Sequence, residues 1–250
     1  MIEVGMAIDV GIQRKGKENQ DALKVILTGE NNSRPPLLIV ADGMGGYQGG
    51  AIASNLVIDT MAEMYLQTSP GEIDDDFLYM SVLAAHKSIQ QWAHNDPSLR
   101  KMGSTVVAAL IDNDLIHLVN VGDSHAYLVN REDIVQINWD HSLVAEEVRI
   151  GNITLEEARH YPGKNILTMS LSASRNDVEP FNNKVKFMSG DTLLLCSDGL
   201  WGVVTDAQMQ AVVMELSPQR AANKLVEMAN ANQGPDNISV IVAKKVKDIL

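Results

Sequence analysis

The chain has 250 residues with a formal net charge of −12 at pH 7, and 45% of its residues are hydrophobic. This length is enough for one large domain, and the negative charge argues against nucleic acid as a partner, because binding the phosphate backbone requires clustered Lys and Arg. No apolar stretch approaches the ~18 residues of a membrane span, there is no signal peptide, and the single cysteine, Cys196, permits no internal disulfide, so we expect a cytoplasmic protein without a membrane partner.

In the first part of the chain, short β-like runs precede two amphipathic segments. Apolar residues recur at helical spacing after the glycine-rich stretch that follows residue 42. A turn-rich piece separates the second and third strands, at 28–36. The pattern predicts strands at 2–11, 22–29 and 37–41, and helices at 51–67 and 73–94.

The second part of the chain returns to strands and then ends in a helix pair and a last strand. Four β-branched runs with short connections must be antiparallel neighbours. The expected strands are 104–112, 115–122, 125–130, 133–138, 185–188, 192–197 and 238–246, and the expected helices are 142–151, 154–162, 206–216 and 218–232. Grouped strands and paired helices favour an α+β fold over alternating βαβ units, and a β-sandwich covered by helices satisfies the pattern. We expect a single domain over 1–250.

Four apolar runs each carry one aspartate at an end. "LLIVADGMGG", "LIHLVNVGDS" and "TLLLCSDG" stop at Asp42, Asp123 and Asp198, and "GPDNISVIV" has Asp236 just before its run. A carboxylate inside such a run would cost several kcal/mol unless it were paired or metal-bound, whereas at the strand end it can face a cleft. Asp-Gly and Asp-Ser are also ordinary turn signals, which is the alternative explanation for any one of the four.

If the four strand ends meet, their like charges need a compensating cation. An all-oxygen set of carboxylates, a carbonyl and waters suits Mg²⁺ or Mn²⁺. Two such ions about 4 Å apart can activate a bridging water and bind a phosphoryl oxygen. The residues therefore indicate binuclear, metal-assisted hydrolysis of a phosphate ester.

Other phosphate-handling motifs do not fit the sequence. The glycines after Asp42 do not complete G-x-G-x-x-G, because Gln48 stands at the third glycine position, and no GK[ST] follows a glycine loop. A cysteine phosphatase needs Arg six residues after its nucleophile, and Gly202 stands there. We expect Cys196 to be a core residue, His117 and His125 to be structural, and the acids at 74–76 to begin a helix.

The motifs "ENQDA", "VADGMGG", "GSTVVAALI", "NVGDSHAYLV", "DHS", "LLLCSDGLWG" and "GPDNISVIV" occur in this order from about residue 8 to residue 243. With these motifs the chain resembles the metal-dependent serine/threonine protein phosphatases of type 2C (the PPM family). Within that family it resembles the bacterial branch most closely. The resemblance implies a central sandwich of two antiparallel sheets flanked by helix pairs. It also implies a mobile flap, which we place at about 141–175.

The resemblance also assigns roles to single residues. Asp42 would bridge two metal ions, with the Gly43 carbonyl on one of them and Asp198 and Asp236 completing the second. Asp123, together with Asp198, would bind the third ion of bacterial members, and Asp21 would hold metal-bound water. A metal-bridging hydroxide would attack phosphorus directly, without a phosphoenzyme.

Three positions depart from the family pattern. The family's phosphate-binding Arg, five residues before the Asp of "NQD", is Gly16 here, so we favour Arg14 for phosphate binding, with Lys17 as the second candidate. The histidine that eukaryotic members use as a general acid is Met44, as in bacterial relatives. The "LTRAL"-like motif reads "LTMSL", with Met169 at the Arg position.

The sequence thus predicts a Mn²⁺- or Mg²⁺-dependent protein phosphatase that acts on phosphoserine and phosphothreonine and opposes a serine/threonine kinase. Its partners would be phosphorylated proteins and that kinase, and we expect a monomer. Two alternatives stay open: a catalytically weak phosphoprotein-binding module on the same fold, and hydrolysis of a small phosphate ester at the same metal site.

Overall fold

The computed structural model describes residues 1–27, 34–45, 49–158, 161–163 and 166–246. The predicted turn at 28–36 lies mostly outside these residues, as do Gly46, Gln48 and parts of the predicted flap and of the predicted helix at 154–162. Within them, no helix is long and apolar enough to cross a membrane.

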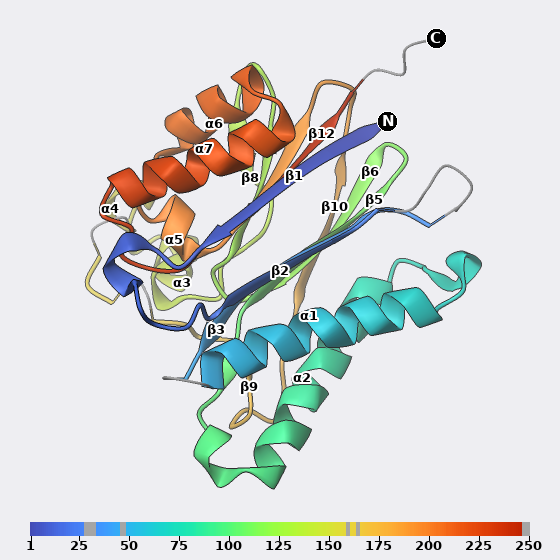
Figure 1. Cartoon of the computed structure of the whole chain (residues 1–250), viewed down its shortest axis with the longest axis vertical. Coiled ribbons are helices and arrows are strands. Elements are labelled where there is room, and N and C mark those ends of the chain that lie inside the picture. The colour runs from blue at the N-terminus through green and yellow to red at the C-terminus, as the bar shows by residue number, and fades with distance from the viewer. Residues whose placement is uncertain (28–33, 46–48, 159–160, 164–165, 247–250) are drawn as a thin grey trace.

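Two antiparallel sheets form the centre of the molecule (Figure 1). The five-stranded sheet has the order β1 (Ile2–Asp9), β12 (Ile238–Lys245), β11 (Thr192–Cys196), β7 (His125–Val129) and β8 (Ile134–Gln136). The seven-stranded sheet has the order β10 (Phe181–Lys186), β6 (Leu115–Val121), β5 (Val106–Asp112), β3 (Leu37–Met44), β4 (Gly103–Ser104) and β9 (Leu171–Ser172), with β2 (Asp21–Ile26) also paired to β3.

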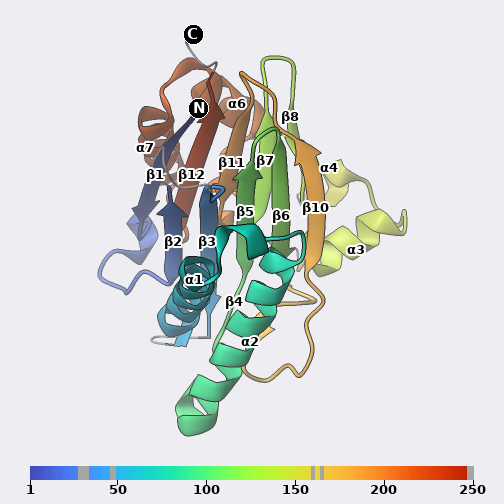
Figure 2. The ribbon, with the colours of Figure 1, turned by 90° about the vertical axis from the view of Figure 1, so that its right-hand side faces the viewer.

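A pair of helices covers the outer face of each sheet, as Figures 1 and 2 show from two directions. The pair α1 (Gly49–Gln67) and α2 (Phe77–Asn95) lies on the seven-stranded sheet, and α6 (Asp206–Glu215) and α7 (Pro218–Ala231) lie on the five-stranded one. The shorter helices are α3 (Leu143–Arg149), α4 (Leu155–Ala158), α5 (Asp198–Trp201) and the 3-10 turns η1 (Ile12–Arg14), η2 (Pro70–Glu72) and η3 (Pro97–Leu99). The predicted α+β sandwich is confirmed.

Alternation along the buried strands produces these layers. In β3, Ile39 packs toward α1 and α2, whereas Leu38 and Val40 pack into the space between the two sheets. In β11, Leu195 likewise faces the other sheet, and Leu194 faces α6 and α7. Because successive side chains point to opposite faces, a strand between two apolar layers must be apolar throughout, which explains the uninterrupted runs in the sequence.

Several predicted boundaries were wrong. The strand expected at 185–188 is β10, which begins at Phe181 and alternates between half-buried and exposed residues as an edge strand does. The second long helix begins at Phe77 rather than 73, after the acids at 74–76. The two-residue strands β4 and β9 and the one-turn helix α5 were not predicted.

Candidate active site

Strand ends from both sheets meet at one end of the sandwich, at the lower left of Figure 1. The register pairs Asp9 with Ile238 and Cys196 with Val240, so β1 and β11 end where β12 begins. In the other sheet, Asp21 pairs with Asp42, so β2 begins where β3 ends. The predicted acids lie on these ends or within two residues of them.

Glycines after two of these acids allow the strand ends to approach one another. A Cβ on Gly43 would lie 2.1 Å from the Gly50 carbonyl oxygen, and one on Gly199 would lie 1.9 Å from that of Asn237. The alternative that Asp42 and Gly43 form a turn is wrong, because β3 continues through Gly43 to Met44. The function of Gly43 is close contact with the first turn of α1.

Asp21 and Asp42 form the base of the site. Asp21 is 5% exposed, and its Oδ2 accepts a hydrogen bond of 2.7 Å from the Ser197 hydroxyl, which joins the two sheets. The Asp42 backbone is fixed by Thr105, whose hydroxyl accepts from the Asp42 N–H at 3.0 Å and whose N–H donates to the Asp42 carbonyl at 2.8 Å. The Asp42 side chain is therefore held on a rigid strand and is only partly exposed.

Asp123 and Asp198 lie on the other side of this base. Asp123 follows β6 and is 7% exposed, and its carbonyl accepts a hydrogen bond of 3.0 Å from the Trp201 indole. The Trp201 ring stacks on His125 with a centroid distance of 4.2 Å. His125 in turn contacts Asp140 at 2.8 Å. Asp198 begins α5, and this short helix therefore carries both Asp198 and the tryptophan that holds Asp123.

Asp236 is paired with the basic side chain of Arg14. Arg14 Nη2 lies 2.8 Å from Asp236 Oδ2, and the other Asp236 oxygen accepts from the Asn237 N–H at 2.7 Å. Lys17 is exposed. Gly16 has φ = 86°, a conformation that favours glycine, so the position of the family's usual arginine is used here to turn the loop.

The carboxylates of the site strongly influence one another. Burial, and then the charges of Asp21, Asp198 and Asp123, raise the pKa of Asp42 well above its usual value. Burial raises the pKa of Asp21 to about 7, partly offset by the Ser197 hydroxyl, and burial with the Asp123 and Asp236 charges raises the pKa of Asp198 to about 7. Burial with the Asp140 charge raises the pKa of Asp123 to about 6. Such crowding of acids is typical of a site that binds a cation.

The donor set fits a hard divalent cation. Its side-chain donors are all carboxylate oxygens, and the buried Oδ1 atoms of Asp21 and Asp198 have no hydrogen-bond partner in the described part of the chain. As the described side chains stand, no three His, Cys, Asp or Glu groups are arranged to hold a metal ion. The reason lies in their pairing: Asp42 hydrogen-bonds to Asp198, and Asp236 is turned to Arg14.

The remaining sequence predictions divide between core and surface. Cys196 is fully buried in β11, as predicted, and burial raises the pKa of its thiol far above the usual value. His117 lies 3.4 Å from Asp75, which also pairs with Lys184, so this acid links α2 to the sheet. Met169 packs against the core beneath α1 and α2. Methionine is uncharged, so Met169 cannot provide the positive charge that the family's arginine would offer to a substrate at this position.

The ends of the predicted flap are tied together. A backbone bridge pairs Ser142 with Leu167, and the Thr168 N–H donates to the His141 carbonyl at 2.9 Å. The His141 N–H donates to the Gly122 carbonyl at 2.9 Å, next to Asp123. The segment that carries α3 and α4 therefore starts and ends beside the site.

Sequence reasoning did not assign several polar residues that hold the site together. Besides Ser197 and Thr105, Asn237 accepts from the Gln20 N–H at 2.8 Å and donates to the Val10 carbonyl at 2.8 Å. These residues stand inside the motifs "CSDG", "GST" and "PDN". Each is a small polar residue next to a strand end, and this position in the sequence could have indicated a role in holding the site together.

A family model described as protein phosphatase 2C matches residues 11–236, a range that includes all five aspartates of the site. The chain belongs to the protein phosphatase 2C family. It is 35% identical over 220 residues to a serine/threonine phosphatase, stp, of Listeria innocua, covering 86% of this chain and 87% of that one.

Two solved structures extend the comparison to the whole fold. The S. agalactiae serine/threonine phosphatase matches with a TM-score of 0.89 and 32% identity, over 99% of this chain and 100% of that one. The catalytic domain of the phosphatase PstP, solved with two manganese ions, matches with a TM-score of 0.84 and 32% identity, over 98% and 99%. The family, the fold class and the enzyme class predicted from the sequence are confirmed.

Proposed function

We propose that this protein phosphatase 2C chain hydrolyses phosphoserine and phosphothreonine in proteins, with Mn²⁺ or Mg²⁺ held by Asp42, the Gly43 carbonyl, Asp198 and Asp236. Asp123 would hold a third ion together with Asp198. The observation that carries the proposal is the convergence of five mutually repelling aspartates on one end of the sandwich. PstP, a relative of the same fold, has been solved with two manganese ions.

The contacts of these side chains determine how they would take up cations. The Asp42 and Asp198 carboxyl groups lie close enough to influence each other's pKa, and carboxyl groups must be deprotonated to coordinate a cation. Asp236 must likewise turn from Arg14, which frees the guanidinium. Loading of the site and release of Arg14 are therefore coupled steps.

The residues around the cations have distinct tasks in the proposed reaction. When bound, the cations supply an activated water and offset the charge of the phosphoryl oxygens. Arg14, once freed, can bind the substrate phosphate with two parallel hydrogen bonds. Asp21 is buried beneath Asp42 and can hold a water in place as a hydrogen-bond acceptor. Water attacks phosphorus directly in this scheme, and Cys196 takes no part, because it is buried in the core.

The remaining predictions complete this proposal. A serine/threonine kinase would supply the phosphorylated proteins, and segment 141–175 would act as a flap over the site within one catalytic domain of 1–250. A cytoplasmic location, a monomeric state and the lack of nucleic-acid and membrane partners stay predictions from the sequence.

Phosphate release from a phosphothreonine peptide, with and without Mn²⁺, tests the function. We expect Mn²⁺-dependent release that falls about a thousandfold in Asp42→Asn, because this variant removes the bridging carboxylate. Asp96→Asn changes an exposed acid that accepts a hydrogen bond from the Ser98 N–H, and it should retain full activity. Activity of Asp42→Asn within threefold of wild type would contradict the metal role.

No release from the wild-type chain at any Mn²⁺ concentration would instead favour the phosphoprotein-binding module. A competition between the phosphopeptide and small phosphate esters would reveal the third alternative.

A further inference from the structure

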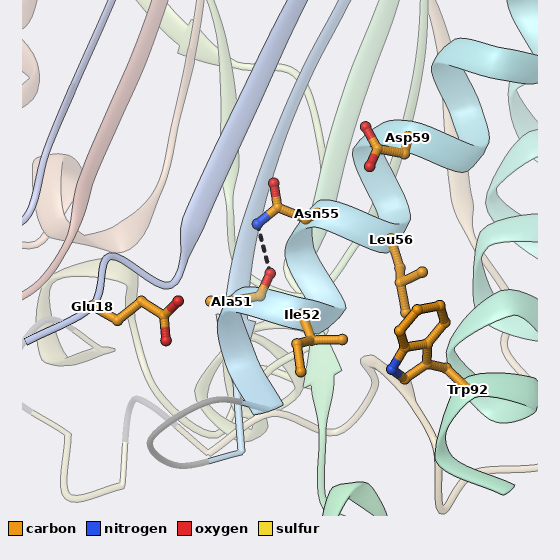
Figure 3. Close-up of a pocket in the computed structure, with 7 residues that line it drawn as sticks. All are labelled: Glu18, Ala51, Ile52, Asn55, Leu56, Asp59 and Trp92. Atoms are coloured by element: carbon orange, nitrogen blue, oxygen red, sulfur yellow. Dashed lines mark hydrogen bonds between the residues drawn. The ribbon is translucent and has the colours of Figure 1, made fainter. Parts of the chain in front are cut away.

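A pocket of about 290 Å³ lies on the surface along the N-terminal half of α1 (Figure 3). The loop before β2 contributes Glu18, one face of α1 contributes Ile52, Leu56 and Asp59, and α2 contributes Trp92. The volume is at the lower limit of small-molecule pockets, which suits one side chain of a larger partner better than a complete ligand.

The chemistry of the pocket wall favours a cation. Both charged residues that line it, Glu18 and Asp59, are carboxylates, and both are exposed. Trp92 is 52% exposed, and an indole face is the best aromatic surface for a Lys or Arg cation. Ile52 and Leu56 extend toward Trp92 in Figure 3, and such an apolar floor can pack against the methylene stem of a long basic side chain.

The first turn of α1 connects the pocket to the site. A Cβ on Gly50 would lie 2.8 Å from the Gly43 carbonyl oxygen and 2.5 Å from the side-chain nitrogen of Gln20, so this turn packs against the residues next to Asp42 and Asp21. Ala51, the next residue, already lines the pocket.

The pocket lining extends along α1 for a distance that a few substrate residues can cover. From Ala51 to Asp59 the helix rises about 12 Å, a distance that an extended peptide covers in about four residues. A substrate whose phosphorylated residue lies at the acids can therefore place a neighbouring side chain in the pocket.

We propose that this pocket binds an arginine or lysine side chain that flanks the phosphorylated residue of the protein substrate. Glu18 and Asp59 attract the cation, Trp92 contacts it through its ring face, and the pocket selects substrates that carry such a residue within about four positions. The inference rests on the proposed phosphatase function but concerns substrate choice rather than hydrolysis.

The test compares phosphothreonine peptides that differ only at the flanking positions. One set carries Arg at two to four residues on either side of the phosphothreonine, and the reference peptide carries Gln there. With Mn²⁺ and about 0.15 M salt, we expect the wild-type chain to prefer an Arg peptide by roughly fivefold in kcat/KM. The preference should fall to within about twofold of unity in Glu18→Gln/Asp59→Asn and in Trp92→Leu.

A matched control separates the pocket from the overall negative charge. Glu132→Gln/Glu215→Gln also removes two exposed carboxylates, but these lie in the β7–β8 turn and on α6, on the other side of the sandwich. This variant should keep the wild-type preference. Equal rates for both peptides in the wild-type chain, or an undiminished preference in Glu18→Gln/Asp59→Asn, would overturn the proposal.

Binding measured without turnover keeps this test independent of the function. The same peptides are titrated calorimetrically into Asp42→Asn and into Asp42→Asn/Glu18→Gln/Asp59→Asn. Asp42→Asn should bind the Arg peptide roughly fivefold more tightly than the Gln peptide. Asp42→Asn/Glu18→Gln/Asp59→Asn should bind the two peptides with nearly equal affinity. Equal affinity of both peptides for the single variant would refute the pocket, whereas failure of the phosphatase function would appear as an absence of phosphate release from every peptide.

Discussion

The aspartates at the strand ends and the acids on the outer surface respond to their surroundings in opposite ways. At the strand ends, burial and like charges raise the pKa of Asp42, Asp123 and Asp198. On the surface, hydrogen bonds from Lys184 and Ser98 lower the pKa of Asp75 and Asp96, respectively.

The difference shows that a net charge of −12 combines two kinds of acid. Surface acids such as Asp75 and Asp96 accept hydrogen bonds from a nearby lysine, hydroxyl or N–H group, and these contacts stabilise the fold slightly. The strand-end acids are held together by the convergence of the sheets, at a cost that a bound cation would offset. The second kind is the one that marks the candidate active site.

The largest effect that would test this difference is the pH dependence of stability in the metal-free protein. Because the folded pKa values of Asp21 and Asp198 are raised to about 7, these groups favour the folded state while protonated. Their contribution is complete below the ordinary pKa near 4 and is lost as the pH rises through about 7. In EDTA we therefore expect the Tm to fall by on the order of 5 °C between about pH 5 and about pH 7.5, and Mn²⁺ to reverse the fall.

Substitution of one acid from each kind sharpens the result. Asp198→Asn should raise the metal-free Tm at about pH 7.5 and flatten its pH dependence, because it removes one repelling charge. Asp96→Asn, on the surface, should leave both unchanged. A wild-type Tm that rises with pH in EDTA would contradict the crowding of the strand-end acids.

A smaller effect is expected from Arg14, the basic residue that pairs with Asp236. Arg14→Ala should raise KM for a phosphopeptide about tenfold while kcat falls less than threefold, because a ground-state contact to phosphate is lost. Lys17→Ala is the matched comparison, since Lys17 lies on the same loop and is exposed. An unchanged KM in Arg14→Ala together with a raised KM in Lys17→Ala would move the phosphate contact to Lys17.

The sequence predicted the acids and the layers because both follow from simple periodicity. A strand buried on both faces, such as β3, must be apolar throughout, so an acid at its end is conspicuous. The long helices α1 and α2 likewise show the helical period over many residues.

The parts that sequence analysis missed lack such a period. The helix α5 has four residues, and β4 and β9 have two each, so tertiary contacts rather than local pattern determine them. The directions in which the side chains of the site point could not be predicted from the sequence either. Nothing in the sequence indicates that Arg14 pairs with Asp236, 222 positions away, because this contact exists only once β12 lies beside β1.

The smallest predicted effect concerns a residue that touches only the backbone of an acid. Trp201→Phe keeps a ring to stack on His125 but loses the N–H that donates to the Asp123 carbonyl. Contacts to the side chains of metal ligands typically contribute about tenfold or more to metal affinity. Because Trp201 contacts only the Asp123 backbone, we expect the Mn²⁺ concentration for half-maximal binding to rise by less than about tenfold. Calorimetric Mn²⁺ titration and the Mn²⁺ dependence of turnover measure it, with Trp139→Phe as the control.

If Trp201→Phe binds Mn²⁺ as wild type does, the carbonyl contact has no part in orienting Asp123, and the connection from β6 alone fixes this acid. If the affinity falls only for the weakest of the bound ions, Asp123 belongs to a separate, third position. Asp42 is held by paired strands, whereas Asp123 is held through Trp201 of α5. A loss of affinity for one ion alone would therefore show that the strand holds Asp42 rigidly, while the position of Asp123 can be adjusted through α5.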